Sequence, residues 1–266
     1  MRQRLKDMDT SKLDLHYSIE QFYFDQERDS RWYLPRIEEA VLEAAGPAPP
    51  TARPALDVAC GTGQQAARLS RLGWQTVGVD ASEGMLHLGR YISAEVPRSV
   101  RLVRSVAEVL PFRDASFDLV ICQGSLDHFA QPRLFMSEAA RVLAPRGRLV
   151  VALANYDSLA CRVGRLVHAA GERLGTTRST DLIYWVTPAD HTFKGTYRLL
   201  VRLGTADLKL EQAFGISLFQ FTAGWRASLN ALPTPVAHAL WRTMDAVGRR
   251  LPALADTGIA VWRKRG

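Results

Sequence analysis

Cysteine is scarce in this 266-residue chain, and long apolar segments are missing. The three cysteines, Cys60, Cys122 and Cys161, lie far apart and form no C-x-x-C pair. They therefore indicate neither a disulfide framework nor a zinc site, and we expect no bound metal. No apolar run is long enough to predict a transmembrane segment, and the charged N-terminus lacks the apolar stretch of a secretory signal. These absences predict a cytoplasmic protein.

Charge of one sign is not concentrated in any part of the chain, although the net charge is +7. No basic tract is interleaved with aromatic side chains, so we expect no nucleic-acid partner. Hydrophobic residues make up 47% of the sequence. That content is sufficient for one α/β domain with insertions or for two small domains.

Residues 55–66, ALDVACGTGQQA, are the most informative stretch of the sequence. The apolar run Ala55–Ala59 predicts a buried strand, and the helical spacing of apolar residues in Gln64–Leu72 predicts a helix. Gly61 and Gly63 lie between them, where they permit positive φ and close approach of a ligand. A strand, a glycine turn and a helix N-terminus direct backbone N–H groups at an anion, so we expect a carboxylate or phosphate here.

Two classes of ligand fit this turn. Residues 61–66 match G-x-G-x-x-A, the relaxed dinucleotide fingerprint, and therefore allow an NAD(P)-binding oxidoreductase. Residues 57–63, DVACGTG, resemble the first motif of the class I methyltransferases that use S-adenosylmethionine (SAM). Asp57 favours SAM, because SAM carries an ammonium group, whereas a pyrophosphate gives no reason for an acid beneath the turn.

A second predicted strand, Thr76–Asp80, ends in an acid. A carboxylate at this strand tip is placed to accept hydrogen bonds from both hydroxyls of an adenosine ribose, in either ligand class. The following segment resembles the family's D-x-S-x-x-M-L, in which the methionine lies near adenine. Met85 occupies that position here, with a place in the core as its alternative role.

The resemblance continues through residues 55–154. Residues 105–121 resemble the family's G-D-A-E-x-L-P-F and F-D-x-V motifs, and residues 138–154 resemble E-x-x-R-V-L-x-P-G-G-x-L. A dinucleotide enzyme has no reason to carry these motifs. The chain thus resembles the ubiquinone/menaquinone-biosynthesis-like branch, type 11, of the class I methyltransferases. No N/D-P-P-Y/F tetrad follows the predicted strand Phe117–Cys122, which argues against base-flipping chemistry.

The resemblance implies SAM as cofactor and a Rossmann-like α/β fold. We expect a seven-stranded, mostly parallel sheet with helices on both faces, an N-terminal helical arm, and a helical cap inserted after the fifth strand. Val106 stands where the family has an acid that contacts adenine, so backbone groups or Glu108 would take over this contact. The implied cofactor site comprises Asp57, Ala59, Gly61, Gly63, Asp80, Ala81, Met85, Val106, Ala107, Glu108, Gln123 and Leu126.

Four regions are predicted. They are residues 1–54 (helical arm and linker), 55–155 (SAM-binding core), 156–207 (substrate cap) and 208–266 (end of the core sheet with a C-terminal amphipathic helix). In that helix, an apolar stripe is formed by Val236, Leu240, Met244, Val247 and Leu251. We expect this stripe to dock on the protein, with contact to a membrane surface as the alternative.

Two histidines are candidates for a general base. His128 lies just past the tip of the predicted strand Phe117–Cys122, and imidazole exchanges protons in a useful pH range. Its alternative role is a loop residue that bonds the backbone. His191, in the cap, and Asp127 are weaker candidates. The residues predicted to contact the substrate are Tyr23, Tyr184, Trp185 and His191.

The predicted reaction is methyl transfer from SAM to a small organic acceptor at an oxygen atom, by in-line displacement. The protein then mainly orients the acceptor and excludes water. Methylation of carbon or nitrogen in a quinone-like or lipid substrate remains an alternative, as do an RNA methyltransferase and a SAM-binding scaffold without activity. We expect a monomer or homodimer and a hydrophobic small-molecule substrate.

Overall fold

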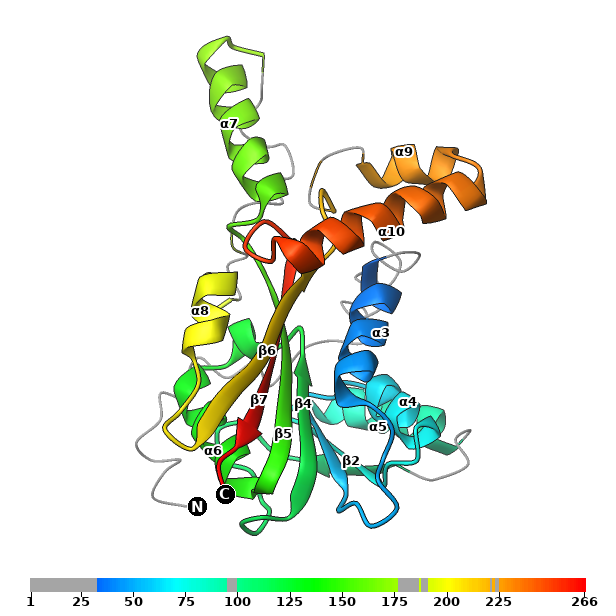
Figure 1. Cartoon of the computed structure of the whole chain (residues 1–266), viewed down its shortest axis with the longest axis vertical. Coiled ribbons are helices and arrows are strands. Elements are labelled where there is room, and N and C mark those ends of the chain that lie inside the picture. Colours follow the sequence, from blue (N-terminus) through cyan, green and yellow to red (C-terminus); the bar gives the residue numbers. More distant parts are fainter. Residues whose placement is uncertain (1–32, 95–99, 177–186, 188–190, 221, 223–224) are drawn as a thin grey trace.

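The computed structural model describes residues 33–94, 100–176, 187, 191–220, 222 and 225–266. Its centre is a sheet of seven strands in the order β3-β2-β1-β4-β5-β7-β6 (Figure 1). The strands are β1 (Ala55–Val58), β2 (Thr76–Asp80), β3 (Arg101–Arg104), β4 (Phe117–Gln123), β5 (Leu143–Ala154), β6 (Leu208–Ile216) and β7 (Thr257–Lys264). Neighbours from β3 to β5 pair in parallel, and β7 runs antiparallel to both β5 and β6. The predicted seven-stranded, mostly parallel sheet is confirmed.

Helices cover both faces of this sheet (Figure 1). The helices of the described residues are α3 (Tyr33–Ala45), α4 (Gln64–Arg71), α5 (Glu83–Ala94), the short 3₁₀ helix η2 (Leu126–His128), α6 (Pro132–Val142), α7 (Leu159–Arg173), α8 (Tyr197–Arg202), α9 (Trp225–Ala231) and α10 (Thr234–Arg250). The helix predicted over Gln64–Leu72 corresponds to α4, and the predicted C-terminal helix corresponds to α10.

The central strands are apolar on both faces, as expected where helices cover a parallel sheet from two sides. Alternate residues of β4 show this arrangement. Val120 and Cys122 belong to a core cluster that includes Phe135 of α6. Leu119 and Ile121 belong to a second cluster, on the side of α3.

The helix α3 is part of this core. Its residues Ile37, Ala40 and Val41 are buried in the cluster that holds Leu119 and Ile121 of the sheet. The sequence analysis assigned residues 1–54 to a helical arm and linker. The part of this arm that forms α3 packs on the core, because its apolar face covers the sheet itself.

The predicted cap, residues 156–207, contains two helices with different surroundings. Leu200 and Leu203, in and next to α8, are buried in the main core cluster, so α8 covers the sheet. Only Ala160 and Cys161 are buried in α7, and Figure 1 shows this helix projecting from one end of the molecule. Within the described ranges, no helix combines the length and apolar character that a membrane span requires.

The C-terminal helix α10 docks through a face that the sequence did not predict. Its buried residues are Ala237, Trp241, Asp245 and Gly248, whereas Val236, Val247 and Leu251 of the predicted apolar stripe are exposed. The physical reason is an ion-pair network: the buried Asp245 accepts a 2.9 Å bond from Nε of Arg36 in α3. It also accepts the backbone N–H of Ser217. The predicted docking of this helix is therefore seen, with Leu240 of the stripe packed against the core, although most of the docking face lies beside the stripe.

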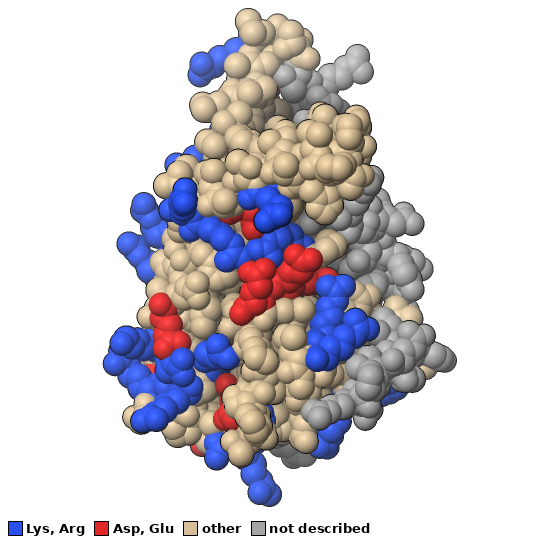
Figure 2. Space-filling view, turned by 45° about the vertical axis from the view of Figure 1, so that its right-hand side comes forward, with Lys and Arg blue, Asp and Glu red and all other residues tan. Residues whose placement is uncertain are grey.

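Charged side chains are unevenly distributed over the surface. In Figure 2 most of the Lys, Arg, Asp and Glu side chains lie on the lower part of the face shown. The upper part of that face, toward the end of the molecule that α7, α9 and α10 form in Figure 1, shows few charged side chains apart from basic ones at its edge. Those helices also carry exposed arginines, among them Arg162 and Arg242. This end also carries the carboxyl termini of the parallel strands, since α7 starts shortly after β5 ends.

Candidate functional site

The turn after β1 has the open geometry that an anion requires. Gly61 (φ 54°) and Gly63 (φ 80°) adopt the left-handed conformation, as does Ala59 (φ 57°), where the family pattern often has glycine. No atom would lie within 4 Å of a Cβ atom built on Gly61. Gly63 caps α4 without a side-chain hydrogen bond, so no side chain occupies the position that faces the first N–H groups of the helix.

Asp57 lies beneath this turn in a fully buried position. Its Oδ2 atom has no hydrogen-bond partner among the described residues. The pKa of Asp57 is raised to about 8, first by burial and second by the negative charge of Asp80, and the backbone N–H of Ala66 opposes both effects. A buried carboxyl with an unused oxygen is the group expected to receive a cation, and the ammonium group of SAM fits this requirement.

Asp80, at the tip of β2, braces the turn. Its Oδ2 accepts the N–H of Gly61 at 2.8 Å, and its Oδ1 accepts the N–H of Ser82, also at 2.8 Å. Each carboxylate oxygen has a second lone pair, so these bonds still leave acceptor positions for ribose hydroxyls. Asp80 thus holds the backbone of the turn, a role that the sequence did not predict. Its contact with the ribose stays a prediction.

The remaining residues of the implied cofactor site differ in exposure. Met85, Ala107 and Leu126 are buried, whereas Ala81, Val106 and Gln123 are partly exposed. Gln123 ends β4 with its Oε1 atom buried and without a hydrogen-bond partner in the described part of the chain. Their contacts with a cofactor remain predictions.

Glu108 has a structural contact that the sequence did not reveal. Its side chain is buried, and Oε1 accepts the backbone N–H of Gln131 at 3.3 Å, just before α6. Burial raises the pKa of Glu108, and hydrogen bonds from backbone N–H groups oppose that shift. Glu108 is therefore not a solvated surface residue, and it braces the start of α6 whether or not it also contacts adenine.

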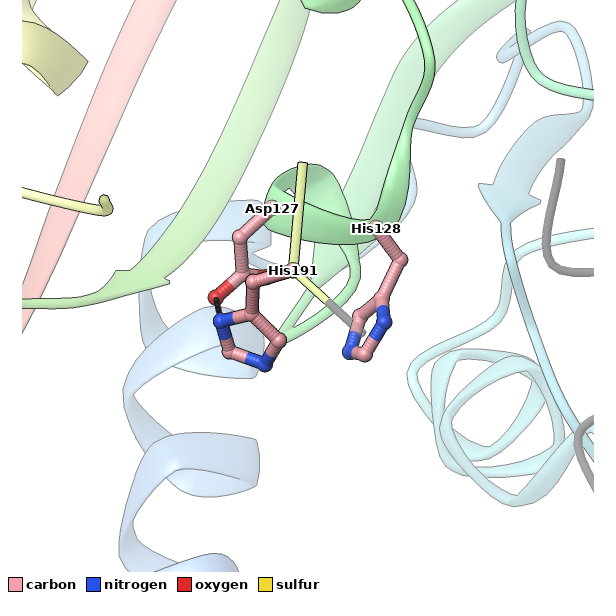
Figure 3. A group of neighbouring side chains, drawn as sticks. All are labelled: Asp127, His128 and His191. Carbon is pink, nitrogen blue, oxygen red and sulfur yellow. Dashed lines mark ion pairs between the residues drawn. The ribbon is translucent and has the colours of Figure 1, made fainter. Parts of the chain in front are cut away.

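Three titratable side chains meet beyond the end of β4 (Figure 3). Asp127 and His128 belong to η2, whereas His191 comes from the chain between α7 and α8. His191 Nδ1 lies 3.0 Å from Asp127 Oδ2, and the rings of His191 and His128 meet edge to face at 4.5 Å between centroids. Asp127 is almost wholly buried.

Backbone contacts hold His191 in this position. The N–H of Thr192 donates to the backbone oxygen of Asp127 at 2.8 Å, and the Thr192 hydroxyl donates to the backbone oxygen of Phe129 at 2.6 Å. The ring of Tyr156 lies edge to face with the His191 ring, at 5.8 Å between centroids. The cap is thus joined to the segment that follows β4.

The Asp127–His191 pair brings together the groups of a general base, with a carboxylate oxygen within ion-pair distance of an imidazole nitrogen. A carboxylate beside Nδ1 holds the proton on that nitrogen, which leaves Nε2 with a lone pair. Among the sequence-predicted candidates, the structure thus pairs His191, the weaker one, with Asp127, whereas His128 stacks against it. Tyr23, Tyr184 and Trp185 lie outside the described residues, so their predicted substrate contacts remain predictions.

The same three side chains are the one group in the described ranges that is suited to a metal ion. Their ligand atoms lie within 4.8 Å of one another. Zinc holds nitrogen and oxygen ligands at about 2.0 to 2.2 Å, so the three groups would have to move closer together around an ion. In the structure His191 Nδ1 and Asp127 Oδ2 already lie within ion-pair distance, 3.0 Å.

The sheet topology discriminates between the two ligand classes left open by the glycine turn. Dinucleotide-binding folds have the strand order 3-2-1-4-5-6 in an open, mostly parallel sheet. Here an antiparallel strand, β7, is inserted between β5 and β6.

Residues 56–151 match the family described as "Methyltransferase domain". The core of this chain is a SAM-dependent methyltransferase domain. Its buried Asp57, open glycine turn and Asp80 fit SAM, whose sulfonium supplies an activated methyl group. The alternative of an NAD(P)-binding oxidoreductase is therefore wrong.

Two relatives show how far the sequence similarity extends. A demethylmenaquinone methyltransferase of Clavibacter sepedonicus is 44% identical over 96 residues, which are 36% of this chain and 39% of that protein. A ubiquinone biosynthesis O-methyltransferase of Caulobacter sp. (strain K31) is 26% identical over 179 residues, 66% of this chain and 67% of that protein. The first match thus spans well under half of either protein.

Solved structures share the fold over nearly the whole chain. A SAM-dependent methyltransferase of Thermotoga maritima, described as a possible histamine N-methyltransferase, superposes with a TM-score of 0.61 at 17% identity, covering 96% of this chain and all of the other. The (4+2)-cyclase SpnF has a TM-score of 0.56 at 22% identity, covering 86% of this chain and 80% of the other. These likenesses establish the fold alone, and the methyltransferase domain on this fold leaves the acceptor open.

Proposed function

We propose that this protein transfers the methyl group of SAM to an oxygen atom of a small, hydrophobic acceptor. The observation that carries the proposal is the Asp127–His191 pair, 3.0 Å apart, beyond the carboxyl end of β4. Ligands of open α/β sheets bind at this edge. A hydroxyl acceptor must lose a proton as its oxygen attacks carbon, and an oriented imidazole is the group that removes it.

In the proposed methyl transfer, the oxygen–methyl bond forms while the sulfur–methyl bond breaks, and S-adenosylhomocysteine leaves. Nε2 of His191 accepts the hydroxyl proton. Asp127 stabilises the resulting imidazolium and later allows the proton to pass to solvent. Asp57, beneath the glycine turn, holds the amino-acid tail of the donor, and Asp80, at the tip of β2, holds its ribose. The methyl group is thereby aligned with the acceptor.

Support for an oxygen acceptor also comes from one of the relatives, which is named a ubiquinone biosynthesis O-methyltransferase. The other is named a demethylmenaquinone methyltransferase. Both names indicate quinone-type acceptors, which are hydrophobic. Methylation of a ring carbon is accordingly the second candidate.

The test is methyl transfer from radiolabelled SAM to a panel of alkyl-substituted catechols, phenols and hydroquinones, with product analysis by mass spectrometry. We expect methyl ethers, formed only by acceptors with a free hydroxyl. A product methylated on carbon would establish the second candidate instead. Binding of SAM without product from any acceptor would contradict the proposal and favour a SAM-binding scaffold.

A chelator distinguishes the base from a metal centre. We expect EDTA to leave the rate unchanged, because the Asp127–His191 contact needs no ion. Loss of activity with EDTA, restored by a divalent cation, would contradict the assignment of His191 as a base. It would show that Asp127, His128 and His191 hold a metal.

A further inference from the structure

The projecting helix α7 carries its apolar residues on the side that faces solvent. Val163, Leu166, Val167, Ala170 and Leu174, which follows the helix, are three or four positions apart, so they form one stripe along it. Leu166 is 71% exposed, Val167 65% and Leu174 77%. A surface helix normally turns such a stripe toward the core, so this arrangement points to a partner.

A second helix at the same end repeats this feature. The stripe of α10 is rotated by about 100°, one residue of a helix, from the face that docks on α3. Val236 and Leu251 are each 51% exposed, and Val247 is 40% exposed. Two exposed apolar stripes thus lie on helices at the same end of the molecule (Figure 1).

The exposed charges next to these stripes are mostly basic, with Glu172 of α7 as an exposed acid. Arg162 and Arg173 of α7 are exposed, and so are Arg242 and Arg250 of α10. The sequence places one acid in each helix: Asp245 is buried against Arg36, and Glu172 lies 3.6 Å from His168. An apolar stripe with flanking arginines complements a bilayer surface with anionic headgroups. Two copies of this surface facing each other would bring like charges together.

This end of the molecule adjoins the acceptor side of the candidate site, which is the part formed by Asp127 and His191. α7 follows β5 closely, and Thr257, which starts β7 after α10, pairs with Ala154 at the end of β5. Asp127 follows Gln123 of β4, which pairs with Ala152 of β5. The apolar end and the Asp127–His191 pair therefore share the carboxyl edge of the sheet.

We infer that α7 and α10 dock this protein on an anionic phospholipid membrane, with Leu166, Val167 and Leu174 entering the interface between headgroups and acyl chains. Docking in this orientation turns the acceptor side toward the bilayer, from which a lipid-soluble acceptor is taken. The statement about the acceptor rests on the proposed function, whereas docking itself does not.

The experiment is co-sedimentation of the full chain, without SAM or acceptor, with two kinds of vesicle. One kind is pure phosphatidylcholine, and the other contains about one-third phosphatidylglycerol. We expect binding to the anionic vesicles that weakens as salt is raised. The double substitution Leu166→Ser with Leu174→Ser should reduce the partition coefficient about tenfold or more, because it removes apolar area from the interface.

Leu210→Ser is the matched control, because Leu210 is an exposed leucine of β6, 39% exposed and far from α7 in the fold. This variant should bind vesicles like the unaltered protein. Since Leu166, Leu174 and Leu210 are all exposed, their substitution should leave folding intact. Circular dichroism and thermal unfolding verify this. Failure of the unaltered protein to bind, or equal binding by the double variant, would overturn the inference.

Sedimentation velocity provides the second readout. If the double substitution converts a dimer into a monomer while vesicle binding stays unchanged, the stripe joins two copies of the chain and the inference is wrong. Because vesicle binding is measured without turnover, an inactive protein that still binds would contradict the proposed function alone.

Discussion

The two sides of the candidate site are built in different ways. The donor side lies within β1, the glycine turn, α4 and β2, and its polar groups are mostly backbone N–H groups together with Asp57 and Asp80. The acceptor side brings together η2 and the cap, with Thr192 bonded to Asp127 across 65 positions of the sequence. In the proposed function, a cofactor common to a large family is thus bound by a local motif, whereas the acceptor meets residues that only the tertiary fold brings together.

The largest effect is expected from His191→Asn, which tests the acceptor side. We expect kcat to fall by about 10²- to 10⁴-fold, the usual contribution of a positioned general base, while the affinity for SAM stays unchanged. Steady-state kinetics and calorimetric titration with SAM measure the two quantities separately. A parallel loss of SAM affinity would show that the two sides of the site are not independent.

His128→Asn is the matched control for that substitution. His128 stacks on His191 but is not the residue paired with Asp127, so we expect a much smaller loss of kcat. Asp127→Asn should lie between the two, since the bonds from Thr192 go to the backbone oxygen of Asp127 and survive the change. A large loss with His128→Asn and none with His191→Asn would instead make His128 the base.

Asp57 offers a test of the donor side by pH. Its pKa is about 8 in the folded protein and near 3.8 in a free chain, so between these values the folded state holds a proton that the unfolded state has released. The free energy of unfolding therefore contains a term that is fully present below pH 3.8 and is lost as pH rises toward 8.

For the protein without SAM, that term decreases by about 1.4 kcal/mol per pH unit. Asp57→Asn removes it, so the stability of the variant relative to the unaltered protein should increase from pH 5 to pH 7, by roughly 3 kcal/mol. Urea unfolding at both pH values measures the difference. An unchanged difference would show that Asp57 is already ionised in the folded protein.

Asp80→Ala tests the ribose contact and the bracing of the turn together. We expect the affinity for SAM to fall roughly tenfold or more, because charge-assisted hydrogen bonds contribute about 1.5 to 3 kcal/mol each. Calorimetry supplies the measurement, with Glu83→Ala as control, since Glu83 is a neighbouring exposed acid paired with Arg104. Unchanged affinity would refute the ribose assignment.

The smallest effect is expected at Ala59, which adopts φ 57° in the turn. Left-handed backbone costs a residue with a Cβ atom about 1 to 2 kcal/mol, and glycine gains part of this back at the expense of its greater freedom in the unfolded chain. Ala59→Gly should therefore stabilise the protein by less than about 1 kcal/mol, as measured by thermal unfolding. Ala67→Gly, inside α4, should destabilise it by about 1 kcal/mol. Destabilisation by both would show that the turn is not strained.

Much of the fold follows from local patterns. Short apolar runs with glycine or acid at their ends placed β1, β2 and β4 within one or two residues, because parallel strands buried on both faces are continuously apolar. The apolar stripe of α10 was also visible, yet its docking face was not. That face includes Asp245, whose burial is stabilised by Arg36 of α3, a residue more than two hundred positions away.

The sequence by itself determined the donor side, because a glycine turn needs only its own residues and the two adjacent strands to direct N–H groups and carboxylates at one ligand. Only the tertiary structure decided that His191 lies beside Asp127, that α3 belongs to the core, and that α7 presents its apolar stripe to solvent. These features depend on contacts between segments far apart in the chain, and the periodicity of one segment contains no information about which face its neighbours will cover.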